Sequence, residues 1–446
     1  MKILFANPPW WVKNDTYAKM GLFTCGVRAG SRWPFTAPVR SQPDKFVYGD
    51  YTPYPFFLGY AATYAQKYSG AEVLFRDSIG LKESYKSFVK YMRETKPDYI
   101  VLESASPSWE HDSQLIQKMH QGWPDMKIIV AGSIASDAKE IMENFPVHAC
   151  IKGEYEKGVV RVLNGEEGII PHDLLTKKEM NDAPYPWYDA LHAKRYCDAG
   201  SLGGFLPHAH VWSSRGCPYK CIFCVWPATM TGNDPDGTQR RSVRHYTKDY
   251  MEGFLTELAM RYRYKSFYFD DDTFNLGNRH VLDMCEVMRK IGLPWSAMCR
   301  ADTIKMETWQ IMRDSGCFGV KLGFESGNQY VVNKIVNKNL DLEYAASVVR
   351  HLKSIGMIIH GTFTFGLPGE TKEQMMDTHR YIQSLPFDSV QRSGTAEIEG
   401  TPLATLAKTG TLSSYEGAKI DENYEVGSDG RVKGDKILNE TIRQVR

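Results

Sequence analysis

The sequence contains no apolar run of the roughly 20 residues that a membrane-spanning helix needs. It also has no excess of either charge, because 54 lysine and arginine residues face 53 aspartate and glutamate residues. A balanced charge offers no extended basic surface for nucleic acid. Residues 1–11 are typical of a strand that runs into prolines, without the features of a signal peptide. We therefore expect a cytoplasmic protein that binds neither a membrane nor nucleic acid.

Cysteine is also scarce, and nine cysteines in 446 residues do not form a disulfide framework. Three of the nine, however, lie within the stretch RGCPYKCIFC at residues 215–224, with the spacing C-x₃-C-x₂-C. Gly216 and Pro218 argue against a regular helix there, so we expect the three thiols in a loop. The other six are expected to be small buried side chains: Cys25, Cys150, Cys197, Cys285, Cys299 and Cys317.

Residues 1–165 alternate short apolar runs with longer amphipathic stretches, which predicts an α/β domain with a doubly wound, Rossmann-like parallel sheet. The expected strands span residues 2–7, 71–77, 98–104, 126–133 and 149–154. The expected helices span residues 54–68, 84–96, 112–123 and 138–145. A proline-rich and aromatic linker is expected over residues 166–206.

The alternation of strands and helices resumes over residues 207–403. Six strands are expected, over residues 208–216, 266–274, 294–302, 319–327, 357–370 and 389–400. Helices such as 248–263 and 343–356 lie between them, and six βα units predict a partial (β/α)₆ barrel. Residues 404–446 are polar and glycine-rich, and are expected to form a cap or a tail.

The expected strands of the first domain end in small or polar residues. Ligands of doubly wound sheets bind at the carboxyl ends of the strands, although ordinary turn chemistry would select similar residues. Because the pattern recurs at four ends, we expect it to mark a ligand site. The candidate residues are Pro8, Pro9, Ser104, Ser106, Ala131, Gly132, Ser133, Gly153 and Glu154.

The three clustered cysteines, Cys217, Cys221 and Cys224, point to a metal site. Four thiolates would close a tetrahedral zinc site or an ordinary iron–sulfur cluster. Three thiolates leave one iron of a cubane cluster open for another ligand. A structural zinc site remains an alternative if His208, His210 or His245 supplies a fourth ligand.

The motif C-x₃-C-x-aromatic-C, placed after a first barrel strand, resembles the signature of the radical SAM superfamily. The resemblance implies that the three cysteines hold a 4Fe–4S cluster and that S-adenosylmethionine (SAM) chelates the fourth iron. An electron from the cluster would then cleave SAM into methionine and a 5′-deoxyadenosyl radical. The missing fourth thiol is, on this interpretation, the place of the cofactor.

The resemblance extends along the barrel, through the segments FDDDTF, CRAD, GFESG and GTFTFGLPGE. It implies contacts with the methionine amine, the SAM carboxylate, the ribose and the adenine, respectively. An arginine suits the carboxylate because its guanidinium binds in a bidentate manner. The implied SAM-binding residues are Asp271, Asp272, Arg300, Glu325, Ser326 and Gly366, together with Phe223 beside the adenine.

The first domain is similar to that of the cobalamin-binding radical SAM enzymes, in the segments PPW, KPDYIVLES, VAGS and KGE. Methylthiotransferases carry three cysteines in this domain, whereas this one holds only Cys25 and Cys150. Enzymes with auxiliary clusters carry cysteines after the barrel, whereas the last one here is Cys317. The motif D-x-H-x-x-G, whose histidine ligates cobalt in other cobalamin domains, is absent; His111 is the histidine that could approach.

The sequence thus resembles a cobalamin-dependent radical SAM methyltransferase, with a 4Fe–4S cluster, SAM and cobalamin as cofactors. The radical would take hydrogen from an unactivated carbon of a small molecule or peptide, and methylcobalamin would supply the methyl group. A flavodoxin- or ferredoxin-type partner would supply electrons. The alternatives are a cyclase or oxidoreductase of the same superfamily without methyl transfer, and a non-catalytic cobalamin or metal sensor. Residues 25–36 form either a lid near the cofactors or a surface loop.

Overall fold

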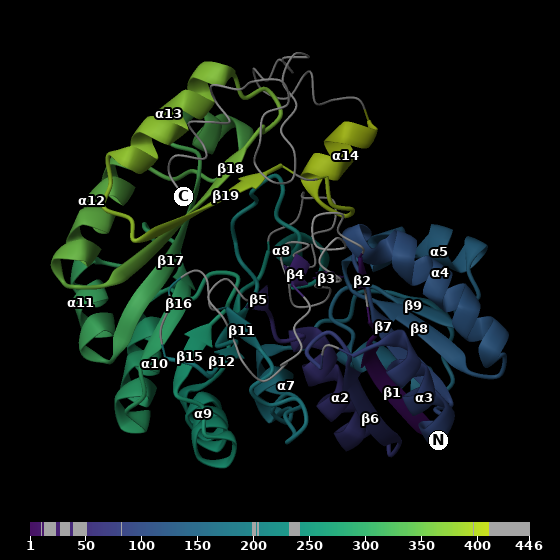
Figure 1. Cartoon of the computed structure of the whole chain (residues 1–446). Helices are drawn as coiled ribbons and strands as arrows, with labels where there is room; N and C mark the ends of the chain where they lie inside the picture. Colours follow the sequence, from purple (N-terminus) through teal and green to yellow (C-terminus); the bar gives the residue numbers. More distant parts are fainter. Residues whose placement is uncertain are drawn as a thin grey trace.

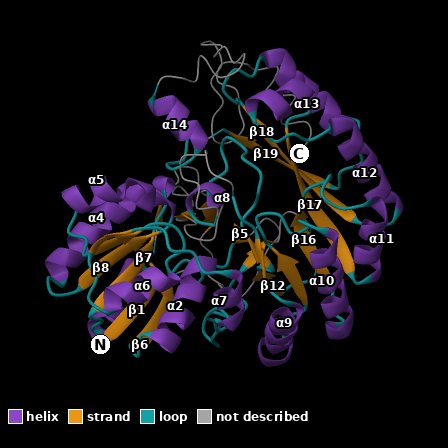
Figure 2. Ribbon diagram, turned by 180° about the vertical axis from the view of Figure 1, so that it is seen from behind, coloured by secondary structure: helices purple, strands orange, loops and turns teal. Residues whose placement is uncertain are grey.

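Two parallel β-sheets lie side by side, each with its own helices (Figures 1 and 2). The structure is a computed structural model that describes residues 1–9, 11–12, 24–26, 36–38, 51–81, 83–198, 202, 205–231, 241–395 and 397–409. Most of the predicted lid over residues 25–36, and the tail beyond residue 409, lie outside these ranges. Among the described helices, none has both the length and the apolar character to span a membrane.

The first sheet is parallel and has the strand order β10-β9-β8-β7-β1-β6. Its strands are β1 (Lys2–Asn7), β6 (Glu72–Asp77), β7 (Tyr99–Glu103), β8 (Lys127–Ala131), β9 (Ala149–Ile151) and β10 (Gly168–Ile170). Because β1 lies between β6 and β7, the chain first winds to one side of β1 and then to the other. The predicted doubly wound sheet is therefore confirmed.

Helices cover both faces of this sheet, and alternate strand residues supply the two contact surfaces. Ile3 and Phe5 face α2 (Phe56–Tyr68) and α6 (Glu156–Leu163). Leu4 and Ala6 face the opposite side. That side is covered by α3 (Tyr85–Thr95), α4 (Ser106–Gly122) and α5 (Ala138–Asn144).

Three features of this domain differ from the sequence-based expectation. Helix α4 begins at Ser106, six residues before the expected start, and it has a proline in its first turn. Helix α6 was not expected, and neither was β10, which pairs with β9 inside the segment predicted as a linker. Strand β10 is only three residues long and one of its isoleucines is exposed, so its sequence carries little of the pattern that identifies a strand.

The second sheet contains the six predicted strands in sequential, parallel order and curves into a partial barrel (Figure 1). The strands are β12 (His208–Val211), β15 (Ser266–Phe269), β16 (Trp295–Cys299), β17 (Cys317–Glu325), β18 (Ile358–Phe365) and β19 (Ser389–Gly394). The helices on its outer face are α9 (Lys248–Tyr262), α10 (Asn278–Ile291), α11 (Met306–Asp314), α12 (Leu342–Ser354) and α13 (Lys372–Gln383).

One hydrophobic core continues from the first domain into the barrel. The ring of Phe56 at the start of α2 stacks on Trp212 at a centroid distance of 4.2 Å. Tyr54 stacks on Tyr188 of the predicted linker at 4.8 Å. The linker is therefore packed between the two domains, and the aromatic residues that marked it in the sequence supply the contact.

Shorter elements connect these layers. They are β5 (Tyr51–Thr52), η1 (Ser133–Asp137), α7 (Lys177–Asp182), β11 (Cys197–Asp198), β13 (Ser214–Arg215), α8 (Trp226–Thr229), β14 (Arg244–His245), the π-helical turn η2 (Val331–Ile335) and α14 (Pro402–Lys408). A small sheet of β2 (Trp11–Val12), β3 (Thr24–Gly26) and β4 (Thr36–Pro38) is described by its backbone. Cys150, Cys285, Cys299 and Cys317 are buried and unpaired, as predicted, whereas the side chains of Cys25 and Cys197 lie outside the described part of the chain.

Candidate functional site

The cysteine loop, residues 216–225, follows strand β13 at the carboxyl end of the barrel. Gly216 begins it with φ 94°, and a Cβ atom there would lie 2.2 Å from the carbonyl oxygen of Ser242. The position therefore requires glycine. The amide of Ile222 donates to the carbonyl of Val336 just after η2, and the amide of Leu403 in α14 donates to the carbonyl of Ile222. The loop is thus fixed between two other segments.

Cys217 is buried, Cys221 and Cys224 are partly exposed, and cationic side chains lie near Cys221. Burial raises the pKa of Cys217 to about 11. Burial also raises the pKa of Cys221, while the nearby cations of Lys338, Arg300 and Arg241 act in the opposite direction. Thiolates bound to iron carry negative charge, which such cations stabilise. The donor set and its surroundings therefore fit an iron–sulfur cluster held by three cysteines.

The zinc alternative fits the described residues less well. No group of three His, Cys, Asp or Glu side chains within the described ranges is arranged to hold one metal ion. A cubane cluster binds its three thiolates on separate irons, so it does not need them to meet at one point. Among the proposed fourth ligands, His208 and His210 bond to each other with their Nε2 atoms 3.0 Å apart, and His245 stacks on His280.

Asp271 and Asp272 connect the cysteine loop to the second barrel strand. The Asp271 carboxylate accepts hydrogen bonds from the amide and hydroxyl of Ser213 and from the hydroxyl of Ser214, and burial raises its pKa to about 7. Asp272 accepts from the amide of Gly216 at 3.0 Å and from the hydroxyl of Thr231. Both acids thus position the start of the cysteine loop, and their contact with the methionine amine stays a prediction.

Arg300 and Glu325 lie close to the cysteine loop. The Arg300 guanidinium pairs with Asp302, donates to the carbonyls of Lys338 and Asn339, and lies 3.7 Å from the centre of the Tyr219 ring. Glu325 has φ 69°, and its carboxylate pairs with Lys338 at 2.9 Å. Both predicted SAM-binding residues therefore lie at the carboxyl end of the barrel, beside the cysteine loop. Each of them also has a partner within the protein.

The remaining three predicted SAM residues lie around the ends of β17 and β18. Phe223 packs into an apolar cluster with Val331 and Leu367. The hydroxyl of Ser326 is buried and lies 2.8 Å from that of Thr378 in α13. Gly366, at φ 71°, donates its amide to the carboxyl of Glu370. Their contacts with the nucleoside part of SAM stay predictions.

Glu370 makes the free energy of unfolding depend on pH. It is buried, and one carboxyl oxygen accepts from the amides of Gly366 and Leu367 while the other has no partner among the described residues. Burial raises its pKa from 4.5 to about 8. Because the folded state holds this proton more tightly than the unfolded chain, the group lowers stability as the pH rises through that range.

We expect Glu370→Gln to remove this pH dependence. Between pH 6 and pH 7.5 the wild type should lose about 2 kcal/mol of unfolding free energy that the variant retains. Urea unfolding at both pH values measures the difference. Glu373→Gln, which changes an exposed glutamate on the adjoining helix, is the matched control. Parallel pH profiles for the wild type and E370Q would contradict the assignment.

The second candidate site lies at the carboxyl ends of the first sheet, between β1 and β7, where the winding reverses. Gly132 has φ 96°, and a Cβ atom there would lie 2.3 Å from the carbonyl oxygen of Ser104. The Ser133 hydroxyl and the Asn7 amide oxygen are buried without a hydrogen-bond partner among the described residues. Buried polar atoms are normally paired, so these two fit the polar edge of a bound ligand such as cobalamin.

The other predicted cobalamin residues surround this edge. Pro8, Pro9 and Ala131 are buried directly at or after the ends of β1 and β8. Ser106 accepts a hydrogen bond from the amide of Glu399, which lies just before α14. His111 lies on α4, and its Nε2 atom is 2.8 Å from the hydroxyl of Tyr85.

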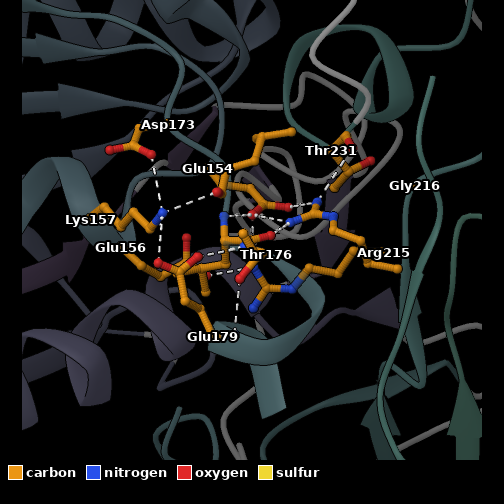
Figure 3. Close-up of polar contacts among 12 residues, drawn as sticks. Glu154, Glu156, Lys157, Asp173, Thr176, Glu179, Arg215, Gly216 and Thr231 are labelled. Carbon is orange, nitrogen blue, oxygen red and sulfur yellow. Dashed lines mark hydrogen bonds and ion pairs between the residues drawn. The ribbon is translucent and has the colours of Figure 1, made fainter. Parts of the chain in front are cut away.

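Glu154, also predicted to contact cobalamin, belongs to a buried ion network that joins the two domains (Figure 3). Its contact with cobalamin stays a prediction. It pairs with Arg244 and, at 3.4 Å, with Arg215, which pairs with Glu156 at 2.6 Å. Burial opposes ionisation of Glu154, but Arg244 and Arg215 outweigh it and lower the pKa of that carboxyl. Gly153, at φ 74°, precedes the network and lies against His172.

Sequence reasoning missed Arg215, Arg244, Glu156 and Lys338. Arg215 carried the clearest signal, because it directly precedes Gly216 and Cys217. Its side chain is 1% exposed and its guanidinium lies 4.5 Å from the centre of the Tyr60 ring of α2. The ion network therefore fixes the start of the cysteine loop against the first domain.

The family of one part of the chain is identified by comparison. Residues 213–382 match the model of the radical SAM superfamily. An uncharacterised methyltransferase of Pyrococcus horikoshii is 24% identical over 383 residues, which cover 80% of this chain and 79% of that protein. Cytidylyl-2-hydroxyethylphosphonate methyltransferase of Streptomyces wedmorensis is 27% identical over 245 residues, which cover 50% of this chain but only 43% of that protein.

Solved structures show the same fold over most of the chain. The radical SAM methyltransferase TsrM of Kitasatospora setae, with cobalamin and a [4Fe-4S] cluster bound, has a TM-score of 0.63 and 15% identity, and the match covers 86% of this chain and 76% of that one. The cobalamin-dependent radical enzyme OxsB, with aqua-cobalamin bound, has a TM-score of 0.57 and 16% identity over 82% of this chain and 54% of that one. Both matches extend across the two domains described above.

Proposed function

We propose that this chain, whose residues 213–382 form a radical SAM domain, is a cobalamin-dependent radical SAM methyltransferase. The observation that carries the proposal is that two candidate sites, each at the carboxyl end of a parallel sheet, are connected within the protein. The three-cysteine loop follows the end of one sheet, and the switch point between β1 and β7, where doubly wound sheets bind ligands, lies at the end of the other. The Arg215 network connects the two, next to the first cysteine.

The residues of the chain have separable roles in this proposal. Cys217, Cys221 and Cys224 hold the cluster, and Arg241 and Lys338 supply positive charge beside Cys221. Gly132 lets the chain turn closely past the end of β7, because any side chain there would meet the backbone of Ser104. When bound, the cluster would supply the electron that cleaves SAM, and cobalamin would carry the methyl group.

The proposed substrate is a small molecule or a peptide, and the methyl group is transferred to one of its unactivated carbons. Similarity to a methyltransferase named for a cytidylyl phosphonate supports a small molecule. The proposal includes a flavodoxin- or ferredoxin-type electron donor and a cytoplasmic location. The four buried, unpaired cysteines that the described chain has outside the cysteine loop suit a reducing compartment.

The test uses anaerobically reconstituted protein, a chemical reductant and methyl-labelled SAM. A methyltransferase of this kind should form 5′-deoxyadenosine and, in addition, about one equivalent of S-adenosylhomocysteine per bound corrinoid. Formation of 5′-deoxyadenosine alone would favour a cyclase or oxidoreductase. The absence of both products would contradict the proposal and favour a non-catalytic sensor.

We expect Gly132→Ala to reduce corrinoid retention at least ten-fold without loss of iron. The added methyl group would lie 2.3 Å from the Ser104 carbonyl oxygen and would displace the loop at the end of β7, beside the proposed corrinoid site. Absorbance of the desalted protein after loading with hydroxocobalamin measures retention. Gly70→Ala is the matched control, since Gly70 also has a positive φ in the same domain but has nothing within 4 Å. Equal corrinoid content in both variants would contradict the placement of the site.

A further inference from the structure

Lys338 is a buried cation on a segment that is fastened to the cysteine loop at two points. The amide of Ile222 donates to the carbonyl of Val336 at 3.0 Å, and the side-chain amide of Asn337 donates to the carbonyl of Lys220 at 3.3 Å. Lys220 and Ile222 are the two neighbours of the middle cysteine of the loop. Lys338 follows directly after these contacts and is 8% exposed. The chain therefore holds this lysine beside the middle cysteine.

The backbone on both sides of Lys338 has a conformation that few residues other than glycine adopt. Asn337 has φ 58° and Asn339 has φ 52°, so Lys338 lies between two left-handed residues. Asparagine tolerates this region better than most residues, but each such position still costs free energy. The guanidinium of Arg300 donates to the carbonyl of Lys338 at 2.7 Å and so holds the segment in this form. Strained backbone of this kind is common at functional sites.

A carboxylate on the barrel wall receives the side chain of Lys338. The ammonium group donates to one carboxyl oxygen of Glu325 at 2.9 Å, and the other oxygen accepts from the hydroxyl of Thr364 at 3.1 Å. Gly323 provides the space, because a Cβ atom there would lie 2.8 Å from the carboxylate and 2.9 Å from the ammonium nitrogen. Glu325 itself is left-handed at φ 69°. The ion pair is thus built into β17 and the segment after η2.

The ion pair is oriented, with its positive end toward the cysteine loop. Lys338 comes from the segment that is fastened to the loop, whereas Glu325 comes from the barrel wall. Burial raises the pKa of Cys221; of the charged groups that act on this thiol, Lys338 lowers the pKa most, and Glu325 opposes it with a smaller effect. Arg300, a further cation near Cys221, is paired with Asp302. The pair as a whole is neutral, but the end nearer to the sulfur is positive.

We propose, on the basis of the function proposed above, that Lys338 raises the reduction potential of the cluster held by the cysteine loop and that Glu325 positions it. Reduction adds one negative charge, and a buried cation beside a ligating sulfur stabilises that charge. Lys338 would thereby ease the transfer of one electron from the flavodoxin- or ferredoxin-type donor. Lys338 is in this proposal a positioning residue for charge and not a ligand of iron.

The test is a potentiometric titration of the anaerobically reconstituted protein, followed by electron paramagnetic resonance of the reduced cluster. At the potential that reduces half of the wild-type cluster, Lys338→Met should have a ratio of reduced to oxidised cluster roughly ten-fold lower than the wild type. Glu325→Gln removes the opposing charge and should shift the midpoint potential in the other direction. Lys338→Arg keeps the charge and should stay near the wild type. Lys334→Met is the matched control, because Lys334 is an exposed lysine on η2 of the same segment, and it should titrate as the wild type does.

Two results would overturn the inference: equal midpoint potentials for the wild type and K338M, or shifts of K338M and E325Q in the same direction. Iron content establishes that each variant holds a cluster, and E325Q remains informative if K338M holds none. A wild type that binds no iron would reject both this inference and the proposed function. Opposite shifts of K338M and E325Q, without formation of S-adenosylhomocysteine by the wild type, would retain the inference and reject the methyltransferase.

Discussion

Replacing Arg215 with methionine is expected to lower the free energy of unfolding by about 3–5 kcal/mol, because it leaves the buried Glu156 carboxylate without its partner and removes one of the two partners of Glu154. Arg215 pairs with Glu156 at 2.6 Å and with Glu154 at 3.4 Å, and neither carboxylate is more than 1% exposed. Urea unfolding measures the loss. The substitution should also reduce iron incorporation, because Arg215 fixes the first residues of the cysteine loop.

A second substitution separates charge from packing at this position. In the double variant R215M/E156Q, part of the lost stability should return, since one unpaired charge is removed. Arg261→Met is the control: Arg261 also pairs with a glutamate, Glu257, but on the surface of α9 at 67% exposure. That change should stay within about 0.5 kcal/mol. Equal losses for R215M and R261M would show that the network does not hold the domains together.

Replacing Cys221 with alanine is expected to reduce the iron content of the reconstituted protein from about four atoms per chain to nearly none. SAM cleavage should be lost with the iron, since the electron for it comes from the cluster. The corrinoid should remain, because its proposed site lies at the end of the other sheet, between β1 and β7. Metal analysis and absorbance of the same sample measure both cofactors.

Cys285→Ala is the matched control for this experiment. Cys285 is buried on α10 and lies outside the cysteine loop, so its removal should leave the iron content unchanged. Iron retained in C221A at the wild-type level, or lost equally in C285A, would show that the three-cysteine loop is not the cluster site.

The sequence predicted the two sheets because periodicity is a local property that each segment displays on its own. Where the local pattern was weak, prediction failed. Strand β10 has three residues with one exposed isoleucine, and α6 follows β9 after a short turn. The early start of α4 had a signal that was not used, namely a proline in the first helical turn after Ala105.

The candidate site was predictable to a different degree in each domain. The cysteines are close in sequence, so their spacing alone indicated a metal centre. The partners of Glu154 are 61 and 90 residues away, at Arg215 and Arg244, and no local pattern connects them. The role of Glu154 in joining the domains could therefore not be predicted, and its contact with cobalamin stays a prediction.

The most direct test of the account is metal analysis with an absorbance spectrum of the anaerobically purified chain, reconstituted with iron and sulfide and supplied with hydroxocobalamin. The account predicts about four irons and one corrinoid per chain after desalting. Iron without corrinoid would retain the radical chemistry and remove the methyl carrier. Zinc without iron would contradict the account as a whole.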